Sequence, residues 1–154
     1  PFQWDGQDTY ESFGRKGALV KNKIKRKQVR FTYHNTMMSS LEGVMARGDR
    51  KVSRAIYRAW ELGCRFDSWT DLFDFEKWQQ AFNDTGLSME FYANRERSYD
   101  EVLPWDHISV GVTKRFLMEE RERAMRAETT PNCRQECQNC GAKSFGGGVC
   151  FDKR

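Results

Sequence analysis

The sequence predicts a mainly α protein, with four or five helices and at most two or three short strands. Apolar residues recur at a helical spacing in several segments. Several of these segments begin at a residue that can cap a helix, or end at a glycine. Alternation of apolar and polar residues, which is typical of a strand, is clear at one place only. The 154 residues are enough for one domain, or for one domain with a short appendage.

The first helix is expected to begin at Asp8 or Thr9 and to reach about residue 26. Either side chain can accept a hydrogen bond from the first turn, and the apolar residues that follow are three or four positions apart. The clearest strand is expected at 29–34, where apolar and polar residues alternate. One face of this strand should be buried.

Four further helices are expected, at about 37–46, 50–62, 69–85 and 112–128. Gly48, Gly63 and Gly86 follow the first three, where glycine commonly ends a helix. Cys64 is interpreted as a small packed residue. Seven residues of the expected strand and helices should be well buried: Phe31, Ile56, Ala59, Trp60, Trp69, Trp78 and Phe82.

The net charge is +4, but basic residues are concentrated in one part of the chain. The segment between Ser12 and Leu41 has no acidic residue and eight basic ones, namely Arg15, Lys16, Lys21, Lys23, Lys25, Arg26, Lys27 and Arg30. We call its densest part, Lys21, Lys23, Lys25, Arg26 and Lys27, the basic patch. Such a block suits an anionic partner, either nucleic acid or an acidic neighbouring domain. The alternative is a solvated helix face.

Four of the five cysteines fall within eighteen residues: Cys133, Cys137, Cys140 and Cys150. Without a recognisable secretory signal, such a cluster indicates a metal site rather than disulfides. Four thiolates suit tetrahedral zinc or an iron–sulfur cluster, and the sequence leaves both open. Cys150 would be the fourth ligand. The alternative is a disordered tail with reduced thiols.

Two smaller groups of polar residues are candidates for a pocket or for contact with an anion. Arg47 and Arg50 flank Asp49, which could also cap the next helix. Asp106 and His107 are adjacent, and His107 has either a structural hydrogen-bonding role or a role in a pocket. No catalytic residue is assigned, because no triad, phosphate-binding loop or dinucleotide motif is readable.

No apolar run approaches the roughly 20 residues that a membrane span needs. The sequence has no recognisable secretory signal, so we expect a cytoplasmic protein without a membrane partner. Because it begins with Pro1 instead of methionine, we expect a processed piece or a fragment of a longer polypeptide.

Five stretches stand out in order: PFQW at 1–4, SLEGVMARGDR at 40–50, AWELGCRFDSW at 59–69, LPWDHI at 103–108 and TPNCR at 130–134. Together they resemble the C-terminal portion of a bacterial family of cobalamin-binding radical S-adenosylmethionine (radical SAM) proteins of unassigned substrate. The resemblance spans nearly the whole chain. Cys133, Cys137 and Cys140 match the terminal cysteines of the family, although the first gap is one residue shorter than the family pattern.

The resemblance implies that a cobalamin-binding domain and a radical SAM barrel come first in the polypeptide. Residues 1–6 would then end the last strand of that upstream barrel, 7–128 would form a mostly helical domain, and 129–154 would be a Cys-rich, metal-binding tail. S-adenosylmethionine, a [4Fe-4S] cluster and cobalamin are implied for the full-length protein only. This extension would shape substrate access and would be inactive as an isolated fragment.

The resemblance does not identify the substrate. The basic patch would fit an RNA or a ribosome-related substrate. An alternative function is a free-standing basic zinc module that binds nucleic acid. Such a module predicts basic and aromatic residues around the cysteines, whereas the basic patch and the cysteines are roughly a hundred residues apart.

Overall fold

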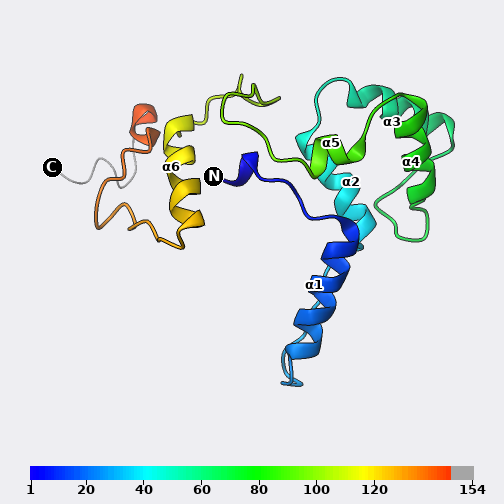
Figure 1. The fold of residues 1–154 in the computed structure, drawn as a ribbon, viewed down its shortest axis with the longest axis horizontal. Coiled ribbons are helices and arrows are strands. Elements are labelled where there is room, and N and C mark those ends of the chain that lie inside the picture. The colour runs from blue at the N-terminus through cyan, green and yellow to red at the C-terminus, as the bar shows by residue number, and fades with distance from the viewer. Residues whose placement is uncertain (147–154) are drawn as a thin grey trace. The chain divides into compact units, whose positions relative to one another are not determined.

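The computed structural model describes residues 1–146, and all regular structure in this part of the chain is helical (Figure 1). The α-helices are α1 (Tyr10–Lys23), α2 (Thr36–Arg47), α3 (Val52–Glu61), α4 (Phe75–Asp84), α5 (Met89–Ala93) and α6 (Lys114–Met125). Short 3₁₀-helices lie at Phe2–Trp4 and Ala142–Phe145. The mainly α class is therefore confirmed. None of the described helices is both long and apolar enough to cross a membrane.

The chain divides into two compact units. The helical unit is Asp5–Glu96, which contains α1 to α5. The tail unit is Pro1–Trp4 together with the chain from Arg97 onward, and it contains α6. These boundaries do not coincide with the division at residues 6 and 128 that the sequence suggested.

Several helices begin where the sequence provides a cap. Thr9 caps α1, because its hydroxyl oxygen accepts a hydrogen bond of 3.3 Å from the backbone N–H of Ser12. Asp74 caps α4 in the same way, accepting from the backbone N–H of Lys77 at 3.2 Å. Each of these bonds satisfies a donor that the first turn of a helix leaves without a partner.

The core of the helical unit forms where α3 packs against α4 and α2 packs against α5. Its buried side chains are Leu41, Val44, Val52, Ala55, Ala59, Cys64, Trp78, Ala81, Phe82, Tyr92 and Ala93. The predicted burial of Ala59, Cys64, Trp78 and Phe82 is thus confirmed. Burial also raises the pKa of the Cys64 thiol, which suits a packed residue rather than a reactive one.

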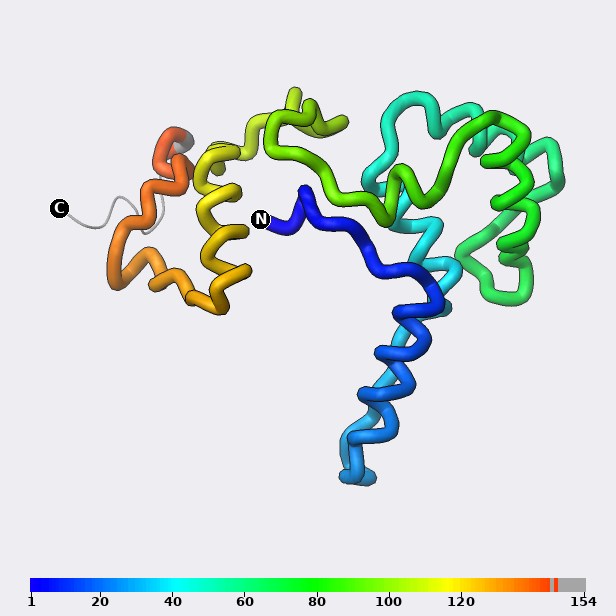
Figure 2. The backbone as a smooth tube through the Cα atoms, in the orientation of Figure 1, coloured from blue at the N-terminus to red at the C-terminus, as the bar shows by residue number. Residues whose placement is uncertain are grey.

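The prediction of a strand at 29–34 is wrong. No residue in the described part of the chain is in a strand, so this segment has no ladder to join. It runs instead as an extended chain back along α1, as the backbone trace in Figure 2 shows. The expected burial of one face is also wrong, since Phe31 is only half-buried and Val29 and Tyr33 are 50% and 52% exposed. The Tyr33 ring nevertheless lies against Gly17 of α1.

Three large side chains expected in the core are exposed instead: Ile56 by 45%, Trp60 by 53% and Trp69 by 65%. The buried face of α3 is a narrow stripe made of Val52, Ala55 and Ala59. Ile56 and Trp60 lie at the edge of this stripe and are therefore exposed.

The expected helix at 69–85 starts later than predicted. Backbone hydrogen bonds from Trp69 to Phe66 and from Leu72 to Trp69 form turns, and the helix begins only at Phe75, after the Asp74 cap. Because Trp69 lies in these turns rather than in a helix, the helical pattern did not describe its burial.

In the tail unit, Phe2–Trp4 form a 3₁₀-helix, so the expectation that residues 1–6 end a strand is wrong for this segment. Trp4 is fully buried, and its ring meets Tyr99 edge-on with the ring centroids 4.9 Å apart. Its carbonyl accepts a hydrogen bond of 2.8 Å from the backbone N–H of Arg97. The indole N–H of Trp105 donates to Oε1 of Gln3 at 2.7 Å. Residues 1–4 are therefore anchored to the segment that follows Arg97.

Candidate functional site

At Cys140, the cysteine-rich tail is hydrogen-bonded to the start of α6. The carbonyl of Cys140 accepts a hydrogen bond of 2.8 Å from the backbone N–H of Thr113, which caps α6. Gly141 has a φ of +99°, and a Cβ there would lie 2.6 Å from the carbonyl oxygen of Gly111. Asn139 is also left-handed, with a φ of 54°. Cys140 therefore lies between two residues with a left-handed backbone, a conformation that carries no steric penalty for glycine.

The three described tail cysteines are accessible but are not brought together. Cys133 and Cys137 are exposed and Cys140 is half-buried, and the Cys137 thiol lies 3.8 Å from Oδ1 of Asn139. In residues 1–146, no three Cys, His, Asp or Glu side chains are grouped so that they could hold a metal ion. The fourth candidate ligand, Cys150, lies outside the described residues. The donor chemistry of this tail suits a metal, but the described geometry contains no assembled site.

The Arg47, Asp49 and Arg50 group has a structural role at the end of α2. Oδ1 of Asp49 accepts hydrogen bonds from the Tyr92 hydroxyl at 3.1 Å and from the backbone N–H of Lys51 at 2.9 Å. Nε of Arg47 donates to the Tyr92 carbonyl at 3.3 Å. Burial and the neighbouring Asp49 raise the pKa of the Tyr92 hydroxyl. Arg47 and Asp49 therefore hold α5 against the α2–α3 turn, while Arg50 is exposed.

Asp106 and His107 are adjacent in the sequence but have different surroundings. Asp106 accepts hydrogen bonds from the Leu103 backbone N–H at 2.9 Å and from Lys114 Nζ at 3.3 Å, and these bonds lower the pKa of its carboxyl group. It also lines an open cavity of about 680 Å³ in the tail unit, together with Trp105 and Leu117. His107 is exposed and is not among the residues that line this cavity.

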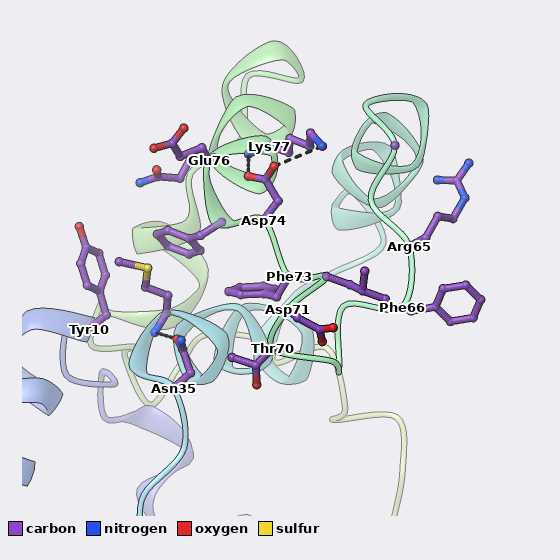
Figure 3. A pocket seen from close by; sticks show the side chains of 15 residues that line it. Tyr10, Asn35, Arg65, Phe66, Thr70, Asp71, Phe73, Asp74, Glu76 and Lys77 are labelled. Atoms are coloured by element: carbon purple, nitrogen blue, oxygen red, sulfur yellow. Dashed lines mark hydrogen bonds and ion pairs between the residues drawn. The ribbon is translucent and has the colours of Figure 1, made fainter.

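A hollow of about 790 Å³ in the helical unit was not anticipated from the sequence (Figure 3). Its aromatic wall includes Tyr10 and Phe75, whose rings meet edge-on at 5.5 Å. Its rim includes Asp71, Asp74 and Glu76. The residues that line it come from the start of α4, from the turns before it and from the starts of α1 and α2. No pattern in the sequence indicated the hollow, because the turns at 69–74 were assigned to a helix.

Asp74, which lines this hollow, bonds to Lys77. Besides capping α4, it forms an ion pair of 3.2 Å with Lys77 Nζ, as the dashed lines in Figure 3 show. The backbone and side chain of Lys77 lower the pKa of the Asp74 carboxyl group. The carboxylate therefore stabilises the start of the helix.

The basic patch lies on a projecting feature of the helical unit. We define the basic arm as α1 together with residues 24–35, which return along it (Figure 1). All eight of its lysine and arginine side chains are exposed. Lys16 pairs with Asp8, whereas the following form no ion pair with any described residue: Lys21, Lys23, Lys25, Arg26, Lys27 and Arg30. An apolar groove of about 400 Å³ between its two segments is lined by residues that include Phe13, Val20 and Phe31.

Large aromatic side chains are exposed on α3 and in the turns after it. We call Tyr57, Trp60, Phe66 and Trp69 the exposed aromatic set. The rings of Tyr57 and Trp60 stack with centroids 5.7 Å apart, and the Arg65 guanidinium lies 4.7 Å from the centre of the Trp60 ring. Phe66 is 74% exposed and has a φ of 56°, which is rare for a bulky residue.

Comparisons with known proteins do not assign the chain to a class. No protein-family model, curated protein or solved structure matches it significantly. The function is therefore argued from the residues and their geometry.

Proposed function

We propose that this chain is the C-terminal extension of a cobalamin-dependent radical SAM enzyme, in which it shapes substrate access and carries a cysteine-ligated metal centre. The five stretches of sequence that resemble this family are the starting point. The [4Fe-4S] cluster, S-adenosylmethionine and cobalamin would be held by preceding domains. On its own, the chain would be inactive, because the residues that bind those cofactors would lie in the preceding domains.

The structural observation that carries the proposal is the exposed aromatic set. Tyr57, Trp60, Phe66 and Trp69 are each more than half exposed, although aromatic residues bury large areas when a partner is available. Soluble proteins seldom expose extended apolar surface unless another surface covers it. Trp60, Phe66 and Trp69 also belong to the 59–69 stretch that resembles the family. We propose that the upstream barrel of the same polypeptide covers this set.

The anchoring of residues 1–4 supports the same arrangement. Gln3 and Trp4 bond to Trp105 and Arg97, respectively, so residues 1–4 are fixed within the tail unit. In the proposed arrangement, residues 1–4 connect the upstream barrel to this chain. Contacts across about a hundred residues of sequence would then hold the tail unit at the exit of the barrel, close enough to restrict the path of a substrate.

The test compares the isolated chain with a longer polypeptide that includes the preceding domains. Hydroxyl-radical footprinting read by mass spectrometry should modify Trp60 and Trp69 in the isolated chain and leave them protected in the longer polypeptide. Trp78 is the internal control, because it is buried within the helical unit and should be protected in both. After reconstitution and reduction, only the longer polypeptide should produce 5′-deoxyadenosine from S-adenosylmethionine.

Two outcomes would overturn the proposal. One is production of 5′-deoxyadenosine by the isolated chain. The other is equal modification of Trp60 and Trp69 in both polypeptides, since the barrel would then not cover the aromatic set. Protection of these residues in the isolated chain that rises with protein concentration would instead assign the surface to a second copy of the chain.

We further propose that Cys133, Cys137 and Cys140 bind one metal centre, with Cys150 as the fourth ligand. Three thiolates within eight residues repel one another, and a bound cation offsets that repulsion. The hydrogen bond from Thr113 to the Cys140 carbonyl ties the backbone that carries this thiol to the start of α6. Zinc would give a colourless protein, whereas an iron–sulfur cluster would give a brown one.

Elemental analysis after anaerobic purification should find about one metal centre per chain, and Cys137→Ser should abolish most of it. Cys64→Ala is the matched control, because this cysteine is buried in the core of the helical unit and should not affect metal content. Removal of the metal should disorder the tail and leave the helical circular dichroism largely unchanged. A metal content below about 0.2 equivalents that is insensitive to Cys137→Ser would refute the metal site.

The structure does not favour the alternative of a basic zinc module. Basic residues that serve a zinc module are expected within the same compact unit as the metal ligands. Here the basic arm belongs to the helical unit, and the cysteine cluster belongs to the tail unit. The two features are therefore interpreted separately.

A further inference from the structure

We propose that the basic arm is a binding site for single-stranded RNA. This inference goes beyond the proposed function and does not depend on it, because all the residues that carry it lie in α1 and residues 24–35. It rests on three observations: six basic side chains without an ion-pair partner among the described residues, a projecting hairpin that carries them, and an exposed aromatic side chain on the same hairpin.

Most of the basic residues on the arm have no acidic partner in the described part of the chain. Between residues 12 and 41 there are eight basic residues and no acidic one. The six from Lys21 to Arg30 form no ion pair with described residues, and all are exposed. Like charges at this density repel each other and oppose the folded hairpin. A polyanion removes the repulsion and gains from the release of its own condensed counterions.

The support of this charge is a helix that projects from the rest of its unit (Figure 2). The fourteen residues of α1 give it a length of about 21 Å. Lys21 and Lys23 lie in its last turn, where the negative end of the helix dipole favours cations. The turn closed by the hydrogen bond from Val29 to Arg26 then reverses the chain. The basic residues are thus displayed on an ordered hairpin.

An exposed aromatic ring lies on the same arm as the cations. Tyr33 is 52% exposed and lies next to Phe31, with ring centroids 5.6 Å apart. One side of the Tyr33 ring rests on α1 at Gly17, where a Cβ would come within 2.9 Å of it. This contact positions the ring on the surface of the arm. A base can stack on such a ring, and stacked aromatics beside a basic track are typical of single-strand binding.

The chemistry of the arm favours RNA over two other anionic partners. A membrane surface would attract the same cations by charge alone, but it offers no flat base to stack on the exposed Tyr33 ring. An acidic peptide would supply negative charge but no base to stack on the exposed aromatic ring. Thr32 and His34, the sequence neighbours of Tyr33, are exposed. Their polar groups can hydrogen-bond to the ribose 2′-hydroxyl of a bound RNA, a group that DNA lacks.

The experiment measures binding of a fluorescein-labelled 12-nucleotide RNA of mixed sequence to the 154-residue chain by fluorescence anisotropy, with salt varied from 50 to 200 mM. Contacts from six cations to phosphates predict a slope of about −4 for log affinity against log salt. The triple variant Lys25→Glu, Arg26→Glu, Lys27→Glu should weaken binding at least about ten-fold and reduce this slope by about 2. Tyr33→Ala should weaken binding by about ten-fold with little change in slope.

The matched control is Lys51→Glu, Arg54→Glu, Arg134→Glu, which makes the same charge change at exposed positions outside the arm. It should retain most of the affinity, and circular dichroism checks that all variants remain helical. Equal weakening by the two triple variants would overturn the proposal, because binding would then follow net charge only. Equal affinity for DNA of the same sequence, or arm-dependent binding to vesicles of anionic phospholipid without RNA binding, would also overturn it. Since the assay contains no S-adenosylmethionine, its outcome is independent of the proposed enzyme.

Discussion

Replacement of Trp78 by alanine is expected to lower the free energy of unfolding of the helical unit by about 3–5 kcal/mol. Trp78 is only 6% exposed and belongs to the core where α3 packs against α4. Its indole N–H also donates to Oδ1 of Asp67 at 3.2 Å. The substitution therefore removes a large apolar side chain, leaves a cavity between two helices and breaks a hydrogen bond to the turns before α4.

Urea unfolding followed by far-ultraviolet circular dichroism measures this effect. Trp60→Ala is the matched control, because the same change is made on α3 at a side chain that is 53% exposed. It should cost less than about 1 kcal/mol, chiefly for the loss of contacts with Tyr57 and Arg65. If the two substitutions had equal effects, or if Trp78→Ala cost less than about 1 kcal/mol, Trp78 would not be a core residue.

Gly6→Ala is expected to destabilise the helical unit by about 1–3 kcal/mol. A Cβ at this position would lie 2.0 Å from the carbonyl oxygen of Asn94, and a backbone atom cannot move away as a flexible side chain can. The same contact is surrounded by hydrogen bonds. The N–H of Gln7 donates to the Ala93 carbonyl at 2.8 Å, and the Asn94 side chain donates to the Gln7 carbonyl at 2.9 Å. An added methyl group would push these segments apart.

Gly14→Ala is the control for this prediction, because nothing lies within 4 Å of a Cβ at position 14. Gly14 is within α1, where alanine has the higher helix propensity, so this variant should be stabilised by up to about 1 kcal/mol. Hydrogen exchange at the Gln7 amide should accelerate in Gly6→Ala only. Opposite signs for the two variants are the expected result, and a neutral Gly6→Ala would contradict the close approach to Asn94.

Local signals in the sequence were sufficient for every described α-helix except the short α5, and for some of the helix ends. Thr9 was one of two expected caps of α1, and Gly48, Gly63 and Gly86 lie just past the ends of α2, α3 and α4. Caps and glycine stops act over a few residues, so they can be read without knowledge of the rest of the fold. The burial of Ala59, Trp78 and Phe82 followed from the same helical spacing.

The candidate site was predicted less completely than the helices. Spacing identified the cysteine cluster, but the described residues of the tail do not bring Cys133, Cys137 and Cys140 together. Charge identified the basic patch, whereas its position on a hairpin depends on residues 24–35 returning along α1. The hollow beside Asp74 had no sequence signal, because turns and a helix can carry the same aromatic spacing.

The sequence by itself determined the mainly α class, the acid-free basic segment and the position of the cysteines, since each depends on residue type and local spacing. Only the tertiary structure decided that residues 29–34 lie against α1 instead of joining a sheet, and that Trp60 and Trp69 face outward. An alternating segment needs one apolar face to cover, and a helix can provide that face as well as a strand can. An aromatic residue is buried only if a neighbouring element reaches it, and that depends on packing across the chain rather than on its own spacing.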